Sequence, residues 1–258
     1  MRIVVLLKAV PVVGAERLAD GSRLDRSALE ANGNDEYVLE AALKLVEVHG
    51  GEVVLLTMGP SAAGDTLRKA LAMGATRAVH VQDGALAGSD TLATGRVLEA
   101  ALRRLDFDLV VAGADTSDGQ GGIVGAAVAT RLGIPYLSYA SVIEPGPDGT
   151  TIRIRRISAT GYDLLEAPLP AFVVGTQLLG EPRYPSLRGI MQARTKETVA
   201  WTLADLGIDP VHVGEASATT RVVAAATPPG RAGAVVVREP PDEAVKRIVE
   251  FLSLRRVI

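Results

Sequence analysis

Short apolar runs alternate with longer amphipathic stretches through the first half of the chain. The runs are rich in Val, Ile and Leu, which is typical of strands covered on both faces of a parallel sheet. They span residues 3–7, 53–57, 78–81 and 109–112. Apolar residues at helical spacing predict helices after residues 32–35 and over residues 61–73, 91–105 and 123–132. The repeated βα pattern predicts an α/β fold with a doubly wound, mostly parallel sheet.

The pattern changes from about residue 140. Residues 151–157 and 161–166 alternate in a way that predicts a pair of antiparallel strands. Residues 171–176 form a further apolar run, which begins just after two prolines. We therefore expect antiparallel additions to the parallel sheet.

The last part of the chain has the composition of an extended arm. Residues 181–241 are polar and then rich in Pro and Gly, and they hold no core of their own. We expect them to pack on the preceding domain or on another chain. An amphipathic helix is predicted over residues 242–254. The predicted division is an α/β domain over residues 1–180 and an arm over residues 181–258.

Composition narrows the classes of function. The chain of 258 residues is 48% hydrophobic and 22% charged, which disfavours disorder. It has no cysteine and three histidines, so disulfide scaffolds, thiolate metal sites and cysteine nucleophiles are excluded, and few ligands remain for zinc. Only 3% of the residues are aromatic and the net charge is −3. Neither base stacking nor a basic field therefore indicates a nucleic-acid partner.

No segment indicates membrane insertion. We find no uncharged apolar run that approaches the ~20 residues needed to cross a bilayer. Lys8 interrupts the apolar stretch at the N-terminus, and no small-residue cleavage site follows it. This stretch is therefore interpreted as a first strand and not as a signal peptide, and we expect a cytoplasmic protein.

The glycine-rich segment at residues 113–125 is the strongest candidate ligand site. It follows a predicted buried strand and opens a predicted helix, and ligands of open parallel sheets bind beyond the carboxyl ends of the strands. Its glycines let backbone N–H groups approach a phosphate, whose charge the helix dipole favours. The segment is neither a Walker A loop nor a dinucleotide fingerprint. On the pattern alone, a phosphate site and a simple turn both remain open.

Other segments end at the same predicted sheet edge. Leu6 and Met58 close the first two strands, and residues 32–35 open the first helix. The Asn and Asp side chains there can bind a ribose or an adenine, or they can cap the helix. Ser89 or Asp90 is expected to cap the helix predicted over residues 91–105. No nucleophile triad or metal-ligand spacing is present in the sequence.

A specific motif lies beyond the predicted sheet. Residues 181–194 read Glu-Pro-Arg-Tyr-Pro-Ser-Leu-Arg-Gly-Ile-Met-Gln-Ala-Arg. This stretch resembles the signature of the electron transfer flavoprotein beta subunit, of the form N-E-P-R-Y-x-x-L-x-x-I-M-x-A-K/R-K. Six other segments resemble the family in the same order. They are residues 5–11, 68–75, 87–91, 113–125, 169–173 and 203–208.

The resemblance implies a fold of the adenine-nucleotide alpha-hydrolase type and a heterodimer with an alpha subunit. One FAD is held mainly by the alpha subunit, and most beta subunits bind a buried AMP. In the electron-bifurcating branch a second FAD takes the AMP position. The chain is then an electron-carrier subunit without bond-making chemistry of its own, and no catalytic residue is implied. The implied AMP site consists of Leu6, Asn32, Gly33, Asn34, Asp35, Met58, Gly113, Ala114, Asp115, Thr116, Ser117, Asp118, Gly119, Gln120, Gly121, Gly122, Ile123 and Val124.

The resemblance also implies a docking role for the signature. In the family, the loop around the signature leucine, here Leu187, inserts into a hydrophobic pocket of partner dehydrogenases, whereas spacing alone favours a core-facing residue. The extended segment after the signature wraps the alpha subunit. Electrons pass from acyl-CoA or similar dehydrogenases to a membrane quinone reductase. The implied docking residues are Arg183, Tyr184, Leu187, Ile190 and Met191.

Two segments differ from the family pattern. Residues 122–124 read Gly-Ile-Val where many members have Asn-Gln-Thr, so phosphate contacts there are expected to come from the backbone. Arg153, Arg155 and Arg156 make one strand basic where some members carry an acidic residue that touches the flavin domain. No aromatic residue lies in the 113–124 segment, which favours AMP over a second flavin.

Two other classes remain open from the residues alone. A stand-alone adenine-nucleotide-binding protein of the universal-stress type accounts for the sheet and the glycine-rich loop. It leaves residues 181–258 unexplained. An ATP pyrophosphatase-type enzyme needs its phosphate loop after the first strand, where this chain has Lys8-Ala-Val-Pro11 instead.

Overall fold

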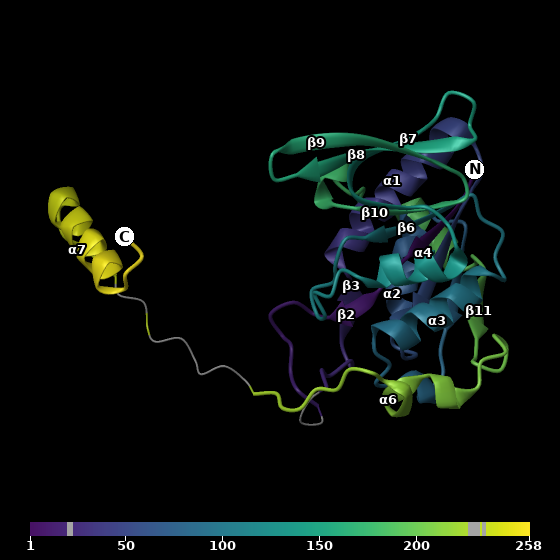
Figure 1. The fold of residues 1–258 in the computed structure, drawn as a ribbon, viewed down its shortest axis with the longest axis horizontal. Helices are drawn as coiled ribbons and strands as arrows, with labels where there is room; N and C mark the ends of the chain where they lie inside the picture. The colour runs from purple at the N-terminus through teal and green to yellow at the C-terminus, as the bar shows by residue number, and fades with distance from the viewer. Residues whose placement is uncertain (20–22, 227–232, 234–235) are drawn as a thin grey trace. The chain divides into compact units, whose positions relative to one another are not determined.

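The computed structural model describes residues 1–19, 23–226, 233 and 236–258. The chain forms two compact units, Met1–Ala224 and Ala225–Ile258. The first unit is built around a nine-stranded sheet with the strand order β11-β5-β4-β1-β6-β10-β7-β8-β9. Figure 1 shows β7, β8 and β9 side by side within this unit. The second contains the helix α7 (Pro241–Leu254), which confirms the amphipathic helix predicted there.

The large sheet is parallel over most of its width. From β11 to β7 in this order, each strand runs parallel to its neighbour, and β8 and β9 continue the sheet antiparallel. The strands are β1 (Arg2–Leu6), β4 (Glu52–Met58), β5 (Arg77–Val81), β6 (Leu109–Gly113), β7 (Tyr136–Pro145), β8 (Thr151–Ser158), β9 (Gly161–Pro168), β10 (Ala171–Gly175) and β11 (Thr198–Trp201). A separate small sheet pairs β2 (Ala9–Pro11) with β3 (Leu29–Ala31) in antiparallel fashion.

Helices cover both faces of the sheet and bury two cores. Alternate residues of one strand point to opposite cores, so Val5 packs with the first and Val4 with the second. This two-sided burial explains why the central strands are continuous apolar runs. The first core is closed by α1 (Gly33–His49) and α2 (Ala63–Met73), and the second by α3 (Thr91–Leu102) and α4 (Val124–Leu132).

The chain beyond β10 continues to pack on the first unit as far as Ala224. Leu203 and Val213 are buried in the second core, and β11 extends the sheet beside β5. The remaining elements are the single-turn helices η1 (Gly84–Leu86), η2 (Gln177–Leu179) and η3 (Pro210–His212), together with α5 (Leu187–Ala193) and α6 (Gly214–Ser217). The wrapping of an alpha subunit by residues 181–258 stays a prediction.

The doubly wound α/β architecture and the β8–β9 hairpin are confirmed, and several local expectations are corrected. The strands β7 and β11 were not expected from the sequence. The sequence predicts Ser61 as the cap of the helix over residues 61–73, but α2 starts at Ala63 and the Ser61 carbonyl accepts the Gly64 N–H in a preceding turn. The helical spacing of residues 91–105 predicts an inward Leu92, but this side chain lies in the first turn of α3 and is 58% exposed. Within the described residues, no helix combines the length and hydropathy needed to cross a bilayer.

Candidate functional site

The glycine-rich segment lies where the strand order changes direction. From β1 the chain adds β4 and β5 on one side of the sheet, and then β6 on the other side. The register pairs Val4 with Val110 and Val5 with Val111, so β1 and β6 end at the same edge. Ligands of open α/β sheets bind at such a switch point, beyond the carboxyl ends of the strands. The residues after β1 and β6 therefore form the candidate site.

A buried carboxylate joins the two strand ends. Asp35 accepts the backbone N–H of Lys8 at 2.7 Å and that of Gly113 at 3.1 Å. Burial raises the pKa of this carboxyl to about 7, although both N–H bonds favour the charged form. Gly113 is required by close approach, because a Cβ there would lie 2.4 Å from Asp35 Oδ1. Asp35 thus fixes how the loop leaves the sheet.

Two asparagines hold the first half of the loop. The Asn32 amide donates to the Asp115 carbonyl at 2.8 Å and accepts the Ser117 N–H at 3.2 Å, and its side chain is buried. Asn34 donates to the same Asp115 carbonyl at 3.4 Å. Asn32 makes no side-chain hydrogen bond that caps α1. The side chains that the sequence offered for ribose, adenine or capping therefore support the loop.

Asp118 holds the second half of the loop to two cations. Its carboxylate accepts from Lys8 Nζ at 2.7 Å and from Arg26 Nη2 at 2.5 Å, and its side chain is only 3% exposed. Burial opposes its charge, but the bonds from both cations lower its pKa to about 2. Lys8 Nζ also donates to Thr116 Oγ1 at 3.3 Å. One carboxylate thus ties the second half of the loop to two cations from distant parts of the chain.

The outer part of the loop offers backbone donors to solvent. Residues 119–123 are exposed, and Gly122 has the positive φ of 61° that favours glycine. Ile123, the residue before α4, provides no side-chain cap. The first N–H groups of a helix have no partner within it, so an uncapped N-terminus can donate to an anion. These residues have the donor chemistry that a nucleotide phosphate requires.

The remaining predicted residues of this site lie on its borders. Leu6 is buried at the end of β1, and Met58 packs against the second core at the end of β4. The N–H of Ala114 donates to the Gly175 carbonyl at 2.9 Å, which fixes the start of the loop to β10. Lys8 and Arg26 were missed as site residues, because only the folded chain places them beside Asp118.

The predicted docking residues form an exposed apolar surface on and before α5. Leu187 is 77% exposed, Met191 64% and Tyr184 92%, while Ile190 is 47% exposed. The core-facing position that spacing alone favoured for Leu187 is therefore wrong. Side chains four residues apart share one side of a helix, so Leu187 and Met191 point outward together. Exposed apolar groups gathered in this way are typical of an interaction site.

Arg183 differs from the other predicted docking residues, because the fold already uses it. Its guanidinium donates to Glu40 at 2.7 Å and also to Glu47. Glu40 has a side chain only 4% exposed, and although burial opposes its charge, the bonds from Arg183 lower its pKa. This ion pair ties the segment before α5 to α1.

Two further contacts fix α5 on α2. A Cβ on Gly189 would lie 2.3 Å from the Ala72 carbonyl oxygen, so only glycine permits this approach of the two helices. Lys196 donates through Nζ to the carbonyls of Leu71 at 2.9 Å and Ala75 at 2.6 Å. One of these carbonyls lies in the last turn of α2 and the other just beyond the helix, so Lys196 holds the C-terminal end of α2. The sequence did not single out Glu40 or Lys196.

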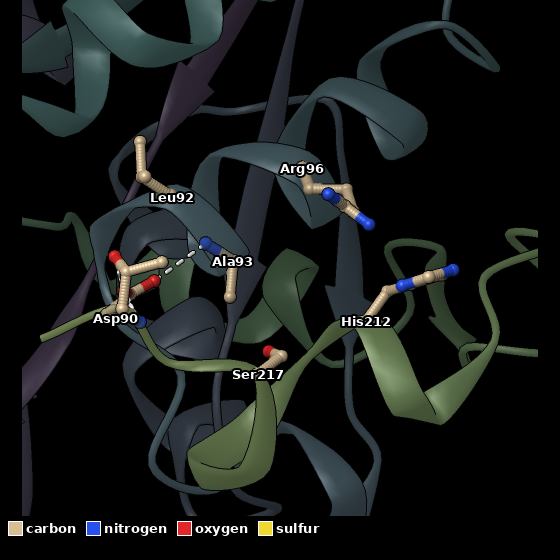
Figure 2. Close-up of a pocket in the computed structure, with 7 residues that line it drawn as sticks. Asp90, Leu92, Ala93, Arg96, His212 and Ser217 are labelled. Carbon is tan, nitrogen blue, oxygen red and sulfur yellow. Dashed lines mark hydrogen bonds between the residues drawn. The ribbon is translucent and has the colours of Figure 1, made fainter.

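Asp90, just before α3, anchors residues 219–220 of the arm. Figure 2 shows its carboxylate on the Ala93 N–H at the start of α3, at 2.9 Å, which confirms the predicted cap. The same carboxylate accepts the N–H of Thr219 at 2.7 Å and that of Thr220 at 3.3 Å. Asp90, Ala93 and Thr219 border a cavity of ≈ 220 Å³, into which Arg96 and His212 also project. One side chain thus caps a helix and holds the arm.

Replacing Asp90 by alanine is expected to lower the free energy of unfolding by about 1 kcal/mol, because both the cap and the arm contact are lost. The bonds to Ala93, Thr219 and Thr220 lower the pKa of Asp90 to about 2. The contribution is therefore complete above the unfolded pKa near 4 and is lost as the pH falls towards about 2. Urea unfolding measures the change, and hydrogen exchange at Thr219 and Thr220 locates it.

The matched control for Asp90 is Asp65→Ala in the first turn of α2. Among the residues that the structure describes, Asp65 pairs only with Arg68, and both side chains are exposed, so its loss is expected to cost less than about 0.5 kcal/mol. Equal losses in the two variants would contradict the anchoring role of Asp90.

The basic strand β8 is neutralised within its own hairpin. Arg153 pairs with Glu166 at 2.8 Å and Arg156 pairs with Asp163 at 2.7 Å across to β9. Arg155 lies over the Tyr162 ring at 5.7 Å. The hairpin therefore presents a balanced surface, and not the block of positive charge that the strand sequence alone indicates.

Comparison with known proteins agrees with this arrangement of fold, loop and helix. The model of the electron transfer flavoprotein domain matches residues 24–206. The electron transfer flavoprotein subunit beta of Mycobacterium leprae is 39% identical over 99% of both chains. The chain belongs to the electron transfer flavoprotein beta subunit family. The subunit beta of Thermoanaerobacterium thermosaccharolyticum is 35% identical over the whole of both chains. Protein FixA of Azorhizobium caulinodans is 37% identical over 82% of this chain and 78% of its own length.

Membership in this family establishes a role in electron transfer within a flavoprotein, in which beta subunits generally pair with an alpha subunit. The matched region includes the glycine-rich loop and α5 and ends just beyond β11. The stand-alone universal-stress and pyrophosphatase classes no longer account for the chain.

Proposed function

We propose that this chain is the beta subunit of a heterodimeric electron transfer flavoprotein whose FAD is held mainly by the alpha subunit. When bound, the FAD supplies the redox chemistry, taking up electrons from a dehydrogenase and giving them to an acceptor. The chain itself encloses the flavin, binds a structural nucleotide and presents a docking helix. Acyl-CoA or similar dehydrogenases are the proposed donors, and a membrane quinone reductase is the proposed acceptor.

The nucleotide proposed for the chain's own site is AMP. Its phosphate is placed at the exposed backbone of residues 119–123 and the free N-terminus of α4. Asn32, Asp35 and Asp118 act as positioning residues, because their side chains fix the loop from below. The single observation that carries the proposal is this pre-built loop, which lies at the switch point with residues 119–123 exposed and the N-terminus of α4 without a side-chain cap.

Nucleotide analysis of the purified heterodimer tests the proposal. The complex is denatured, and the released FAD and AMP are quantified by chromatography and mass spectrometry. We expect one FAD and one AMP per heterodimer. Two FAD and no AMP would overturn the AMP assignment and favour a bifurcating subunit with a second flavin in this loop. A stable, ATP-binding chain that needs no partner would overturn the subunit proposal itself.

The partner contacts follow from the two apolar surfaces on the chain. We place the dehydrogenase on α5, where Leu187 is the exposed anchor. We place the alpha subunit against the arm, whose helix α7 exposes Val245, Ile248, Val249 and Phe251. An amphipathic helix with an uncovered apolar stripe is typical of a segment that packs on another chain.

Leu187→Ala in the heterodimer is expected to lower kcat/KM for reduction by an acyl-CoA dehydrogenase about tenfold, with fold and FAD content unchanged. The loss corresponds to about 1.4 kcal/mol, typical of one buried apolar anchor. Stopped-flow reduction of the flavin measures it. Leu92→Ala is the matched control, since Leu92 is also an exposed leucine but lies on α3. An unchanged rate for Leu187→Ala would remove the docking role of α5.

A further inference from the structure

We propose that the groove between α2 and α5 is a second part of the docking surface and takes an acidic segment of the partner dehydrogenase. The inference rests on the proposed docking role of α5 and extends it to α2. Two of the cations involved, Arg68 and Lys69, belong to the 68–75 segment, which neither the proposed AMP site nor the docking helix α5 uses. The groove provides a role for this segment.

The groove adjoins the docking helix directly. It has a volume of ≈ 650 Å³ and lies between α2, α5 and the chain around β3. Gly189 and Ala193 face α2, so the helical turn places Ile190 and Arg194 on the flank of α5 that borders the groove. Ile190 lines the groove and also stands beside the exposed Leu187. A partner that covers Leu187 therefore reaches the groove without a break in the surface.

The lining of the groove combines an apolar floor with a cationic rim. The apolar part includes Val12, Leu29, Ala72, Pro185 and Ile190. The charged residues that line it are Arg68, Lys69 and Arg194 against the single carboxylate of Asp65. Three cations against one anion leave an excess of positive charge on a chain whose net charge is −3. Such a local reversal of sign is what an acidic partner surface complements.

The existing ion pair on the rim does not cancel this charge. Arg68 bonds Asp65 at 2.8 Å, but both side chains are more than half exposed, so the pair is weak and free to rearrange. Lys69 also lies near Glu36, which offsets part of its charge but is not among the residues that line the groove. An incoming carboxylate can therefore still be attracted by the rim.

The occupant is a protein segment because the groove is wide, mixed in polarity and continuous with α5. An extended stretch that carries Asp or Glu beside an apolar side chain fits both the rim and the floor. Contacts at such a rim chiefly set the orientation and rate of encounter, whereas the buried anchor sets how long the complex lasts. The groove thus complements Leu187 and does not replace it.

Charge reversal at Lys69 tests the proposal in the assembled heterodimer. Flavin reduction by an acyl-CoA dehydrogenase with its acyl-CoA substrate is followed at about 0.02 M and about 0.5 M salt, which changes screening from weak to strong. Lys69→Glu is expected to lower kcat/KM about three- to tenfold at low salt, and the deficit is expected to shrink at high salt. Arg96→Glu, on the opposite face of the sheet, is the matched control and is expected to match the parent.

The possible outcomes separate this proposal from the one on which it rests. If Leu187→Ala slows reduction but Lys69→Glu does not, the groove is overturned and the docking role of α5 stands. If neither variant slows reduction, both are overturned. A Lys69→Glu deficit that is equal at both salt concentrations, or that comes with loss of FAD or AMP, marks a structural effect and also overturns the groove. Arg68→Glu is expected to repeat the salt-dependent result.

Discussion

Arg183→Met is expected to lower the free energy of unfolding of the Met1–Ala224 unit by about 3 kcal/mol. The substitution leaves Glu40 without its main partner while its side chain is only 4% exposed, and an uncompensated buried charge costs several kcal/mol. Lys44 at 3.5 Å is the only other cation paired with Glu40 among the described residues, and its side chain is 53% exposed. It therefore compensates poorly. Urea unfolding followed by circular dichroism measures the loss.

The pH dependence of this loss has a definite sign. Because the folded state lowers the pKa of Glu40, the stabilisation by Arg183 is complete above the unfolded pKa near 4.3 and disappears as the pH falls below it. The difference between parent and Arg183→Met is therefore expected to narrow towards pH 3. A difference that stays constant with pH would contradict the ionic origin.

Two control variants isolate the buried pair. Glu47 is the other carboxylate paired with Arg183, and its side chain is 54% exposed. Glu47→Gln is therefore expected to lower the free energy of unfolding by less than about 1 kcal/mol. The double variant Arg183→Met/Glu40→Leu removes both charges and is expected to regain most of the loss. If the double variant is as unstable as the single one, packing and not charge explains the effect.

Gly113→Ala is expected to lower the free energy of unfolding by about 2–3 kcal/mol and to release the proposed AMP. A Cβ at this position would lie 2.4 Å from Asp35 Oδ1 and 2.7 Å from the Asn34 Cβ, so strand and helix must separate. The displaced Asp35 then loses its bonds to Lys8 and Gly113. Unfolding and the AMP content of the purified heterodimer measure the two effects.

Gly121→Ala is the matched control within the same loop. A Cβ at Gly121 has no atom within 4 Å, so the fold is expected to keep the stability of the parent. Equal stability of the two alanine variants would contradict the role assigned to Gly113. The comparison also separates the position that builds the loop from one that lies on its outer surface.

Hydrophobic periodicity predicted the parallel core because burial on both faces leaves a clear pattern. The strand β7 was missed for a local reason, since Tyr139 has a positive φ of 56° and a bulge near it breaks the alternation. The strand β11 was missed because four residues with alternating partial exposure give a weak signal, and β5 supplies the edge that it needs. Short edge strands depend on their neighbours more than on their own residues.

The candidate site was likewise predictable from the sequence only in part. The glycines of the loop and the docking residues were accessible from local sequence and from the resemblance. The contacts that hold them were not, because they join residues far apart in the chain, such as Lys8 with Asp118 and Arg183 with Glu40. Hydrophobic periodicity contains no information about pairs of residues that lie so far apart in the chain. Asn32 illustrates the limit, since its position at a helix start left a nucleotide contact and a cap both open, while its amide in fact bridges the loop.

The short helix α5 has a consequence for the lifetime of complexes. A helix of 7 residues is unstable by itself, but Arg183, Gly189 and Lys196 hold this one against α1 and α2 before any partner arrives. Docking then orders few new groups, so little conformational entropy is lost and a small contact area suffices. A small, rigid contact also dissociates quickly. In the proposed role the carrier can thus leave one partner in time to meet the next, with turnover set by short residence and not by tight binding.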